Sequence, residues 1–401
     1  MKYFSTIFLV VVLFAAQAIA QNAGGIELTQ IQKMRQAFEA DAANVVRMNA
    51  LSNNAIKDIA LNRANMGSLD HNFKYRVKVK GISDQKSSGR CWLFTSYNVL
   101  RPLVIDKYKL SDFEFSHNYL FFWDQFEKAN LFLENIIAHA DEEIDSRYNH
   151  WLLGSPVGDG GVWSSFTNLV VKYGLVPSTI MPETHNSDNT AYMSRMLNRK
   201  LREFAIELRQ LKASKTKAKD IAARKLEMMS TVYRMLALNF GVPPESFEYR
   251  FVTSDGDIGE TKQYTPQTFA QEVLPDVVYT DYVMLMNDPT RDYYKLYEID
   301  NDRNVMEGRN WIYINLPSDE IKKYAVLSIK ANDAMYASCD VGKQLNSDLG
   351  ISDVDNYDFE SVYNVKFGMN KKERILTRES GSSHGMALIA VDVDKDEKNE
   401  V

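Results

Sequence analysis

Cysteine is scarce in this chain of 401 residues, which contains only Cys91 and Cys339. Two cysteines cannot build the several bridges of a disulfide-stabilised scaffold, and a chain of this length can bury a core without them. A sequence does not reveal the distance between two residues, so a bridge between these two stays an alternative to two free thiols. The role of each cysteine therefore has to be considered separately.

Several motifs of other enzyme classes are missing as well. The sequence contains no HExxH pair for zinc, no GxxxxGK[ST] loop for phosphate and no GxSxG turn for a serine nucleophile. The formal net charge of −6 gives the whole chain no general attraction to nucleic acid or to an anionic membrane. We therefore expect no metal and no cofactor.

A long apolar run occurs only at the start of the chain. Residues 1–20 place Lys2 before an apolar stretch and end in Ala18-Ile19-Ala20, the pattern of a cleaved secretory signal. The run is shorter than the roughly 20 apolar residues that span a bilayer, so an uncleaved membrane anchor is the less favoured alternative. The sequence thus predicts an exported chain, periplasmic or extracellular, with no stable membrane anchor and a mature part of residues 21–401.

Helical and strand patterns divide this mature part. Apolar residues recur every three or four positions in residues 27–63, which predicts two helices, and again at about 186–241, which predicts two more. Tyr75, Val77 and Val79 alternate with basic residues, as in a half-exposed strand. Four short apolar stretches between turn residues predict strands in the C-terminal third: NWIYINLP, YAVLSIK, AMYASCDVG and MALIAVDVD. We expect Cys339, in the third of them, to lie at a buried strand end. The mixture is typical of the α+β class.

One of the helical stretches is strongly basic. Residues 199–225 carry ten lysines or arginines against three acidic residues. We favour a solvated helix face at a domain edge or a subunit contact, because no base-reading motif accompanies the charge. Nucleic acid is therefore not an expected partner, and binding of a polyanion is the alternative.

Cys91 lies in the most informative motif, DQKSSGRCW at residues 84–92. It opens a predicted helix behind a Ser-Ser-Gly turn, so the helix dipole and unpaired amides would favour the thiolate, which is the nucleophilic form. The same amides, with the side-chain amide of Gln85, could hold the oxyanion of an acyl-transfer intermediate. On spacing alone, a buried structural cysteine is the alternative.

A thiol nucleophile needs an imidazole partner, and His384 is the candidate among six histidines. It follows a Gly-Ser-Ser turn, precedes Gly385 and starts an apolar strand, a setting that can aim an imidazole from a rigid edge. The remaining histidines lie in predicted helices or polar loops, and we expect ordinary surface or core roles for them: His71, His117, His139, His150 and His185.

Six stretches, in order along the chain from about residue 50 to 395, carry a family resemblance: QKSSGRCWLF, SHNYLFFWDQFEKANLFLE, GDGGVWSSFTNLVVKYGLVP, LNRKLREFAIELRQL, SCDVGKQLNSDLG and SGSSHGMALIAV. They resemble the bleomycin hydrolase and aminopeptidase C group of papain-like cysteine peptidases. His384 follows Cys91 by 293 residues, whereas simple papain-like enzymes have a gap of about 130–150. A helical insertion at about 186–300 would supply the excess, and this group carries such an insertion.

The resemblance implies a papain-like α+β fold with a helical lobe that opens with Cys91 and an antiparallel β lobe that presents His384. It implies that Cys91 is the nucleophile, that His384 is the general base and acid, and that Gln85 is an oxyanion donor. Gly160 and Gly161 would present backbone groups to the substrate beside the nucleophile. It also implies peptide substrates, cleavage near an N-terminus as in an aminopeptidase, and a homo-oligomer.

The sequence departs from the family pattern in three respects. No Asn-Ser-Trp-Gly motif, whose asparagine orients the imidazole in the family, stands between His384 and Val401. The family's C-terminal tail, which enters the cleft and limits attack to N-terminal residues, does not occur, and many members are intracellular. We therefore expect an exported peptidase, truncated before that motif and impaired in activity. The alternative is a non-catalytic remnant that oligomerises or binds polyanions.

Overall fold

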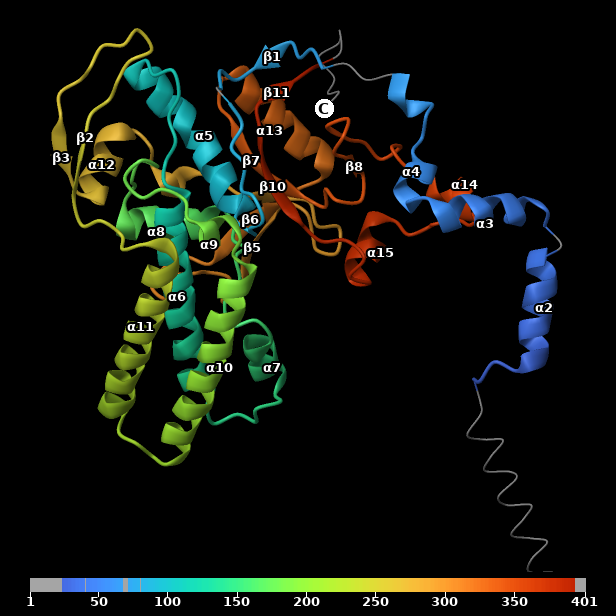
Figure 1. Ribbon diagram of the computed structural model, residues 1–401, viewed down its shortest axis with the longest axis horizontal. Coiled ribbons are helices and arrows are strands. Elements are labelled where there is room, and N and C mark those ends of the chain that lie inside the picture. Colours follow the sequence, from blue (N-terminus) through green and yellow to red (C-terminus); the bar gives the residue numbers. More distant parts are fainter. Residues whose placement is uncertain (1–23, 40, 68–70, 80, 394–401) are drawn as a thin grey trace, which may run out of the picture. The chain divides into compact units, whose positions relative to one another are not determined.

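The computed structural model describes residues 24–39, 41–67, 71–79 and 81–393, and they form two compact units. Of the described residues, the first unit combines those up to residue 67 with residues 344–368, and the second combines residues 71–343 with residues 369–393. Figure 1 follows the chain through its elements. The predicted signal, residues 1–20, lies outside the described residues.

The first unit joins the N-terminal helices to residues 344–368 by backbone hydrogen bonds. The amide of Asp358 donates to the carbonyl of Ala60 at 2.7 Å, and the amide of Asn62 donates to the carbonyl of Asn356 at 2.8 Å. Its elements are α2 (Leu28–Glu39), α3 (Ala43–Asn53), α4 (Ile56–Ala60), η1 (Asn65–Gly67), β8 (Leu345–Asn346), β9 (Ile351–Ser352) and α14 (Phe359–Tyr363).

The sequence predicts two helices in residues 27–63, and this prediction is wrong, because the described residues of that range form three α-helices. Asn54 and Ala55 adopt extended backbone conformations, which end α3 and begin α4 within the same apolar pattern. α2 has no buried residue, so its apolar repeat does not face a core.

Helices dominate the first two thirds of the second unit. They are α5 (Cys91–Tyr108), α6 (His117–Ala138), α7 (Arg147–Gly154), α8 (Trp163–Tyr173), α9 (His185–Asp188), α10 (Ala191–Ala213), α11 (Ala218–Phe240) and α12 (Pro266–Val273), followed by η2 (Tyr279–Asp281), α13 (Ser318–Lys330) and α15 (Lys371–Leu376). α6, α10 and α11 lie side by side (Figure 1). The predicted helical stretch of residues 186–241 is thereby confirmed. α11 ends at Phe240, and the next residue is Gly241, whose φ of 88° suits glycine.

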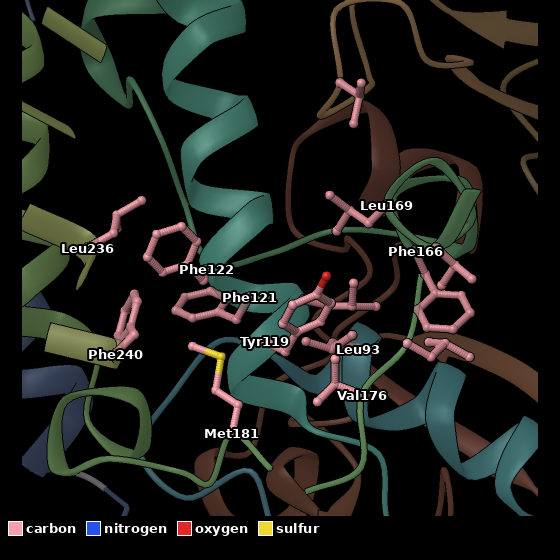
Figure 2. Packing of buried hydrophobic residues seen from close by; sticks show 14 of the residues in the cluster. Leu93, Tyr119, Phe121, Phe122, Phe166, Leu169, Val176, Met181, Leu236 and Phe240 are labelled. Carbon is pink, nitrogen blue, oxygen red and sulfur yellow. The ribbon is translucent and has the colours of Figure 1, made fainter. Parts of the chain in front are cut away.

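The main core lies between these helices. Figure 2 shows aromatic side chains of α6 between α11 and α8, with Phe121 and Phe122 toward Leu236 and Phe240. The ring centroids of Phe121 and Phe240 are 5.4 Å apart. Burying a side chain of this size stabilises the fold by about 1.5–3 kcal/mol. The aromatic-rich segment of residues 117–138 therefore forms the central helix that the others cover.

Short strands make up the remainder of the second unit. They are β1 (Tyr75–Arg76), β2 (Phe247–Tyr249), β3 (Lys262–Tyr264), β4 (Leu285–Met286), β5 (Lys295–Ile299), β6 (Trp311–Asn315), β7 (Met335–Cys339), β10 (His384–Leu388) and β11 (Ala390–Val391). β7 pairs with β10 and β1 with β11, both antiparallel, while β6 lies between parallel β4 and antiparallel β5. Beyond Phe240, the range 186–300 thus carries the strands β2 to β5 in addition to α12.

One local prediction needs correction. YAVLSIK is helical, since it ends α13, whose first turn carries acidic Asp319 and Glu320 and whose buried residues Ala325, Val326 and Ile329 share one face. The seven-residue window was too short to show that helical period.

Within the described part of the chain, no helix is both long enough and apolar enough to cross a membrane.

His117 is a buried core histidine, and we predict that it makes the fold sensitive to acid. Its ring stacks on Phe94 with centroids 3.6 Å apart, and burial, followed by the charges of Arg90 and Arg101, holds its pKa well below the ordinary value. As the pH falls, the unfolded chain therefore binds a proton at His117 before the folded chain does. The folded state keeps its full stability with respect to this group above about pH 6.5 and loses stability as the pH drops below that value. We expect the thermal midpoint to fall less between about pH 7 and pH 5 in His117→Phe than in the parent.

His139→Gln provides the control, because His139 is one-third exposed and pairs with Glu142 at the surface. Equal pH dependence of the midpoint in the parent and in His117→Phe would contradict the prediction.

Candidate active site

Cys91 is the first residue of α5, as the sequence predicts. The amides of Leu93 and Phe94 donate to the carbonyl of Arg90 at 2.9 and 3.1 Å. The two preceding amides, those of Cys91 and Trp92, come before the first carbonyl that the helix offers and are available to a ligand. Because the thiol is only half-buried, the alternative of a fully buried structural cysteine is not what the structure shows.

His384 is the first residue of β10, and this strand packs against the start of α5 (Figure 1). A Cβ atom on Gly385 would lie 3.6 Å from Cα of Trp92 and 3.3 Å from Oγ1 of Thr95. Trp92 and Gly385 each follow a candidate residue by one position, so the Cα atoms of Cys91 and His384 are at most about 13 Å apart. The fold thus brings the backbones of Cys91 and His384 into one region, although the two residues are 293 positions apart in the sequence.

Tyr336 is a residue that the sequence motifs did not single out. It lies on β7 opposite Ala387, and its hydroxyl would be 3.2 Å from a Cβ atom on Gly385. Burial, followed by the nearby charge of Cys91, raises the pKa of this hydroxyl. The hydroxyl therefore stays protonated beside the thiol. Its only signal in the sequence is its place in the predicted strand AMYASCDVG.

Gln85 lies in the turn that leads to Cys91. Its Nε2 donates to the carbonyl of Ser88 at 2.5 Å, and Oγ of Ser88 donates back to the carbonyl of Gln85 at 2.6 Å. A primary amide has two N–H groups, so one stays available for a substrate oxygen. The turn is held from outside by the amide of Ser87, which donates to the carbonyl of Asp188 at 2.9 Å.

Arg90 anchors this turn in the interior. Its guanidinium is fully buried, pairs with Glu183 at 2.8 Å, and lies over the rings of Phe94 and Phe121. Oγ of Ser187 donates to the same Glu183 oxygen at 2.5 Å. The guanidinium also lies 4.0 Å from a carboxylate oxygen of Asp188, and its Nε donates to Oγ of Ser88 at 2.9 Å. The residue before the candidate nucleophile is therefore rigidly placed.

Residues 159–161 run along the other side of Cys91. The carbonyl of Asp159 accepts from Nε1 of Trp92 at 2.7 Å, and its carboxylate accepts from the amide of Gly89 at 3.1 Å. The carboxylate also accepts from Thr190 and Ser194. Asp159 was not predicted as a site residue, although it directly precedes the two predicted glycines. It ties their backbone to both sides of the nucleophile.

The two glycines differ in their surroundings. A Cβ atom on Gly161 would lie 2.8 Å from Cδ2 and Cε2 of Trp92, whereas one on Gly160 would meet nothing within 4 Å. Gly161 is therefore required by the close approach of its backbone to the indole, and Gly160 lies at an open edge.

Cys339 ends β7 directly opposite His384. It is exposed, so the expectation of a buried strand end is wrong, and both thiols are free, so the alternative of a bridge is not realised. Partial desolvation, followed by the charge of Asp340, raises the pKa of the Cys339 thiol. Cys339 stands at the end of a strand and not, like Cys91, at the N-terminus of a helix.

Several cations of the basic stretch 199–225 have partners within the chain. Arg202 donates to the carbonyls of Leu153 and Gly154, and Arg209 donates to those of His139 and Glu142. Further basic residues form ion pairs: Lys200 with Glu203, Arg224 with Glu207 and Glu227, and Lys225 with Glu134. These partners favour the interpretation that the basic stretch is a helix face that binds neighbouring segments of the chain. They speak against the alternative of a polyanion site.

The difference between the two glycines predicts different costs of adding a methyl group. Gly161→Ala forces the methyl into the buried ring of Trp92, and such overpacking destabilises by about 1–3 kcal/mol. Gly160→Ala, the matched control, should change the free energy of unfolding by no more than about 0.5 kcal/mol. Urea unfolding of both variants checks this, and an equal loss of stability would contradict the assigned packing.

Comparison with known proteins gives close relatives. Residues 25–401 match the Peptidase C1-like family. Bleomycin hydrolase of Mus musculus is 37% identical over 378 residues, which cover 92% of this chain and 83% of that protein. Aminopeptidase C of Listeria monocytogenes is 34% identical over 377 residues, which cover 93% of this chain and 85% of that protein.

A solved structure agrees. The crystal structure of PepW from Lactobacillus rhamnosis HN001 matches with a TM-score of 0.90 at 36% identity, and the match covers 94% of this chain and 84% of that chain. The mixed α+β fold predicted from the sequence is thereby confirmed, as is the resemblance carried by the six stretches. The chain belongs to the Peptidase C1-like family, with bleomycin hydrolases and aminopeptidases C as homologues.

Proposed function

We propose that this chain is a cysteine peptidase that removes residues from the N-terminus of peptides. The observation that supports this most directly is the packing of Gly385 against Trp92, which places the start of β10 beside the start of α5. Relatives named aminopeptidase C support the choice of an aminopeptidase over an endopeptidase. Peptide substrates follow from the family.

The proposed reaction begins with a proton transfer from the thiol of Cys91 to the imidazole of His384. The thiolate attacks the scissile carbonyl carbon, and the resulting oxyanion is held by the amide of Cys91 and by Nε2 of Gln85. As the C–N bond breaks, His384 gives its proton to the leaving amine and a thioester remains on Cys91. His384 then takes a proton from water as the water oxygen attacks the thioester carbonyl carbon. The C–S bond breaks, the acid leaves, and His384 returns the proton to the sulfur of Cys91, which restores the thiol.

Tyr336 suits this scheme as a neutral neighbour of the thiol. Since its hydroxyl keeps its proton, it can donate a hydrogen bond toward a developing negative charge without competing for the proton that Cys91 releases. Gly160 and Gly161 would hold the substrate backbone along the opposite side of Cys91.

Three further properties are also proposed. We propose two papain-like lobes, with α5 and its helical neighbours facing the strands β7 and β10, and an insertion at about 186–300. We propose export directed by residues 1–20. We also propose association between copies of the chain, a proposal supported by α2, which presents Ile31, Met34 and Phe38 without burying any of its residues.

Cys91 should be the reactive thiol and the essential one. We predict that iodoacetamide modifies Cys91 much faster than Cys339 at neutral pH, because only Cys91 stands at a helix N-terminus and the pKa of Cys339 is raised. Cys91→Ala should abolish hydrolysis of aminoacyl arylamides, while Cys339→Ser should retain it. Mass spectrometry of the alkylated chain and a rate assay measure both effects.

Equal alkylation of both thiols without turnover would instead favour the non-catalytic alternative. Hydrolysis by Cys91→Ala at the parent rate would refute the proposed mechanism.

Gln85 should affect the chemical step more than substrate binding. We predict that Gln85→Ala lowers kcat by about 10²–10³-fold with little change in KM, because an oxyanion donor acts mainly in the transition state. The alkylation rate of Cys91 should change little, which separates loss of an oxyanion donor from collapse of the turn. A rise in KM with unchanged kcat would contradict the role.

A further inference from the structure

Lys128 of α6 has an unusual set of partners beneath the candidate substrate edge. Its ammonium lies 2.6 Å from Oδ2 of Asp124, 2.9 Å from the carbonyl of Gly158 and 2.6 Å from the carbonyl of Gly160. An ammonium group has three N–H donors, so these acceptors use all of them. The side chain is only 15% exposed. Lys128 is therefore a fixed cation rather than a mobile surface charge.

Asp124 holds this cation from the interior. It is fully buried, its Oδ1 accepts from Nδ2 of Asn304 at 2.9 Å, and its Oδ2 accepts from Nε2 of Gln125 at 3.1 Å. Burial raises the pKa of Asp124, while Lys128 and these amide donors act in the opposite direction. The carboxylate thus depends on Lys128 for compensation, and the ammonium is kept in one place.

Further hydrogen bonds connect residues 158–160 with α6 and with α5, the helix that begins at Cys91. Gly158 also accepts from Nε2 of Gln125 at 3.0 Å, and the carbonyl of Asp159 accepts from Nε1 of Trp92 at 2.7 Å. Three consecutive carbonyls, those of residues 158–160, are thereby engaged by α6 and α5. None of these bonds uses the amide or the carbonyl of Gly161, which stay available to a bound peptide.

We propose that Lys128 is a positioning residue for the substrate: by binding the carbonyls of Gly158 and Gly160, it sets the backbone of residues 160–161 against which the peptide lies. This inference rests on the proposed peptidase function. Lys128 takes no part in proton transfer, because its three donors point to fixed acceptors. Its loss should weaken substrate binding and leave the reactivity of the Cys91 thiol intact.

The test compares Lys128→Met with Lys225→Met. Lys225 is a matched control: it is 17% exposed, pairs with the α6 residue Glu134 and donates to Asn130 at 2.8 Å, but makes no bond to residues 158–161. Bonds to a charged group contribute about 1.5–3 kcal/mol, so we expect Lys128→Met to raise the KM for aminoacyl arylamides about 10–100-fold. The kcat and the alkylation rate of Cys91 should stay near the parent values in both variants.

A double variant separates positioning from stability. Lys128→Met leaves Asp124 buried without its cation and can impair folding, whereas Lys128→Met with Asp124→Asn removes both charges. We expect the double variant to unfold at a higher temperature than Lys128→Met and to keep the raised KM. Recovery of the parent KM with the recovered stability would overturn the proposal, as would a fall in the alkylation rate of Cys91.

A binding measurement at equilibrium tests the role of Lys128 independently of whether the chain is a peptidase. Calorimetric titration of a tripeptide into Cys91→Ala, with and without Lys128→Met, requires no turnover. If the parent chain does not hydrolyse arylamides, the proposed function fails, while a dissociation constant raised about 10-fold or more by Lys128→Met still supports the positioning role. Equal dissociation constants would overturn it.

Discussion

The packing of three segments around the buried Trp92 is the interaction on which the rest of the candidate site depends. Trp92 follows Cys91 on the first turn of α5, its Nε1 donates to the carbonyl of Asp159, and Gly161 lies against its ring face. Gly385 approaches its Cα atom from β10, which brings His384 to the same place. Trp92 thus contacts the segments of the candidate nucleophile, base and substrate edge, with its indole toward residues 159–161 and its backbone toward Gly385. A residue that is packed on all sides cannot shift without disturbing each neighbour.

Buried charges hold the segments that surround this indole. Arg90 fixes the turn before Cys91 through Glu183, and Asp124 fixes the strip of residues 158–160 through Lys128. Such pairs contribute little to net stability, because desolvation of both ions offsets much of their attraction. Their geometric effect is larger, since each hydrogen bond limits where a backbone carbonyl or a turn can lie. The site is built on rigid elements, as a nucleophile and its partner require.

The sequence predicted the parts of the site that have local signals. The helix start at Cys91 follows from the Ser-Ser-Gly turn and the apolar repeat behind it, and the strand start at His384 follows from its own turn. Predictions that depended on a short window or on surroundings were less successful. YAVLSIK was predicted as a strand because its helical period extends beyond those seven residues, and Cys339 was predicted to be buried because its neighbours are apolar. The exposure of a strand residue depends on which other segments pack against the strand. The sequence of the strand itself does not show these segments.

The sequence by itself determined the α+β class, the family, the six stretches that carry the resemblance, and the identity of the candidate thiol, imidazole, amide and glycines. These depend on residue type and local spacing, which a single chain displays directly. Only the tertiary structure decided that Gly161 and not Gly160 must lack a side chain, that Tyr336 and Asp159 belong to the site, and that Lys128 supports the substrate edge. The physical reason is that each of these roles arises from contacts between segments far apart in the chain. Such contacts are selected by packing and by the satisfaction of buried polar groups rather than by local pattern.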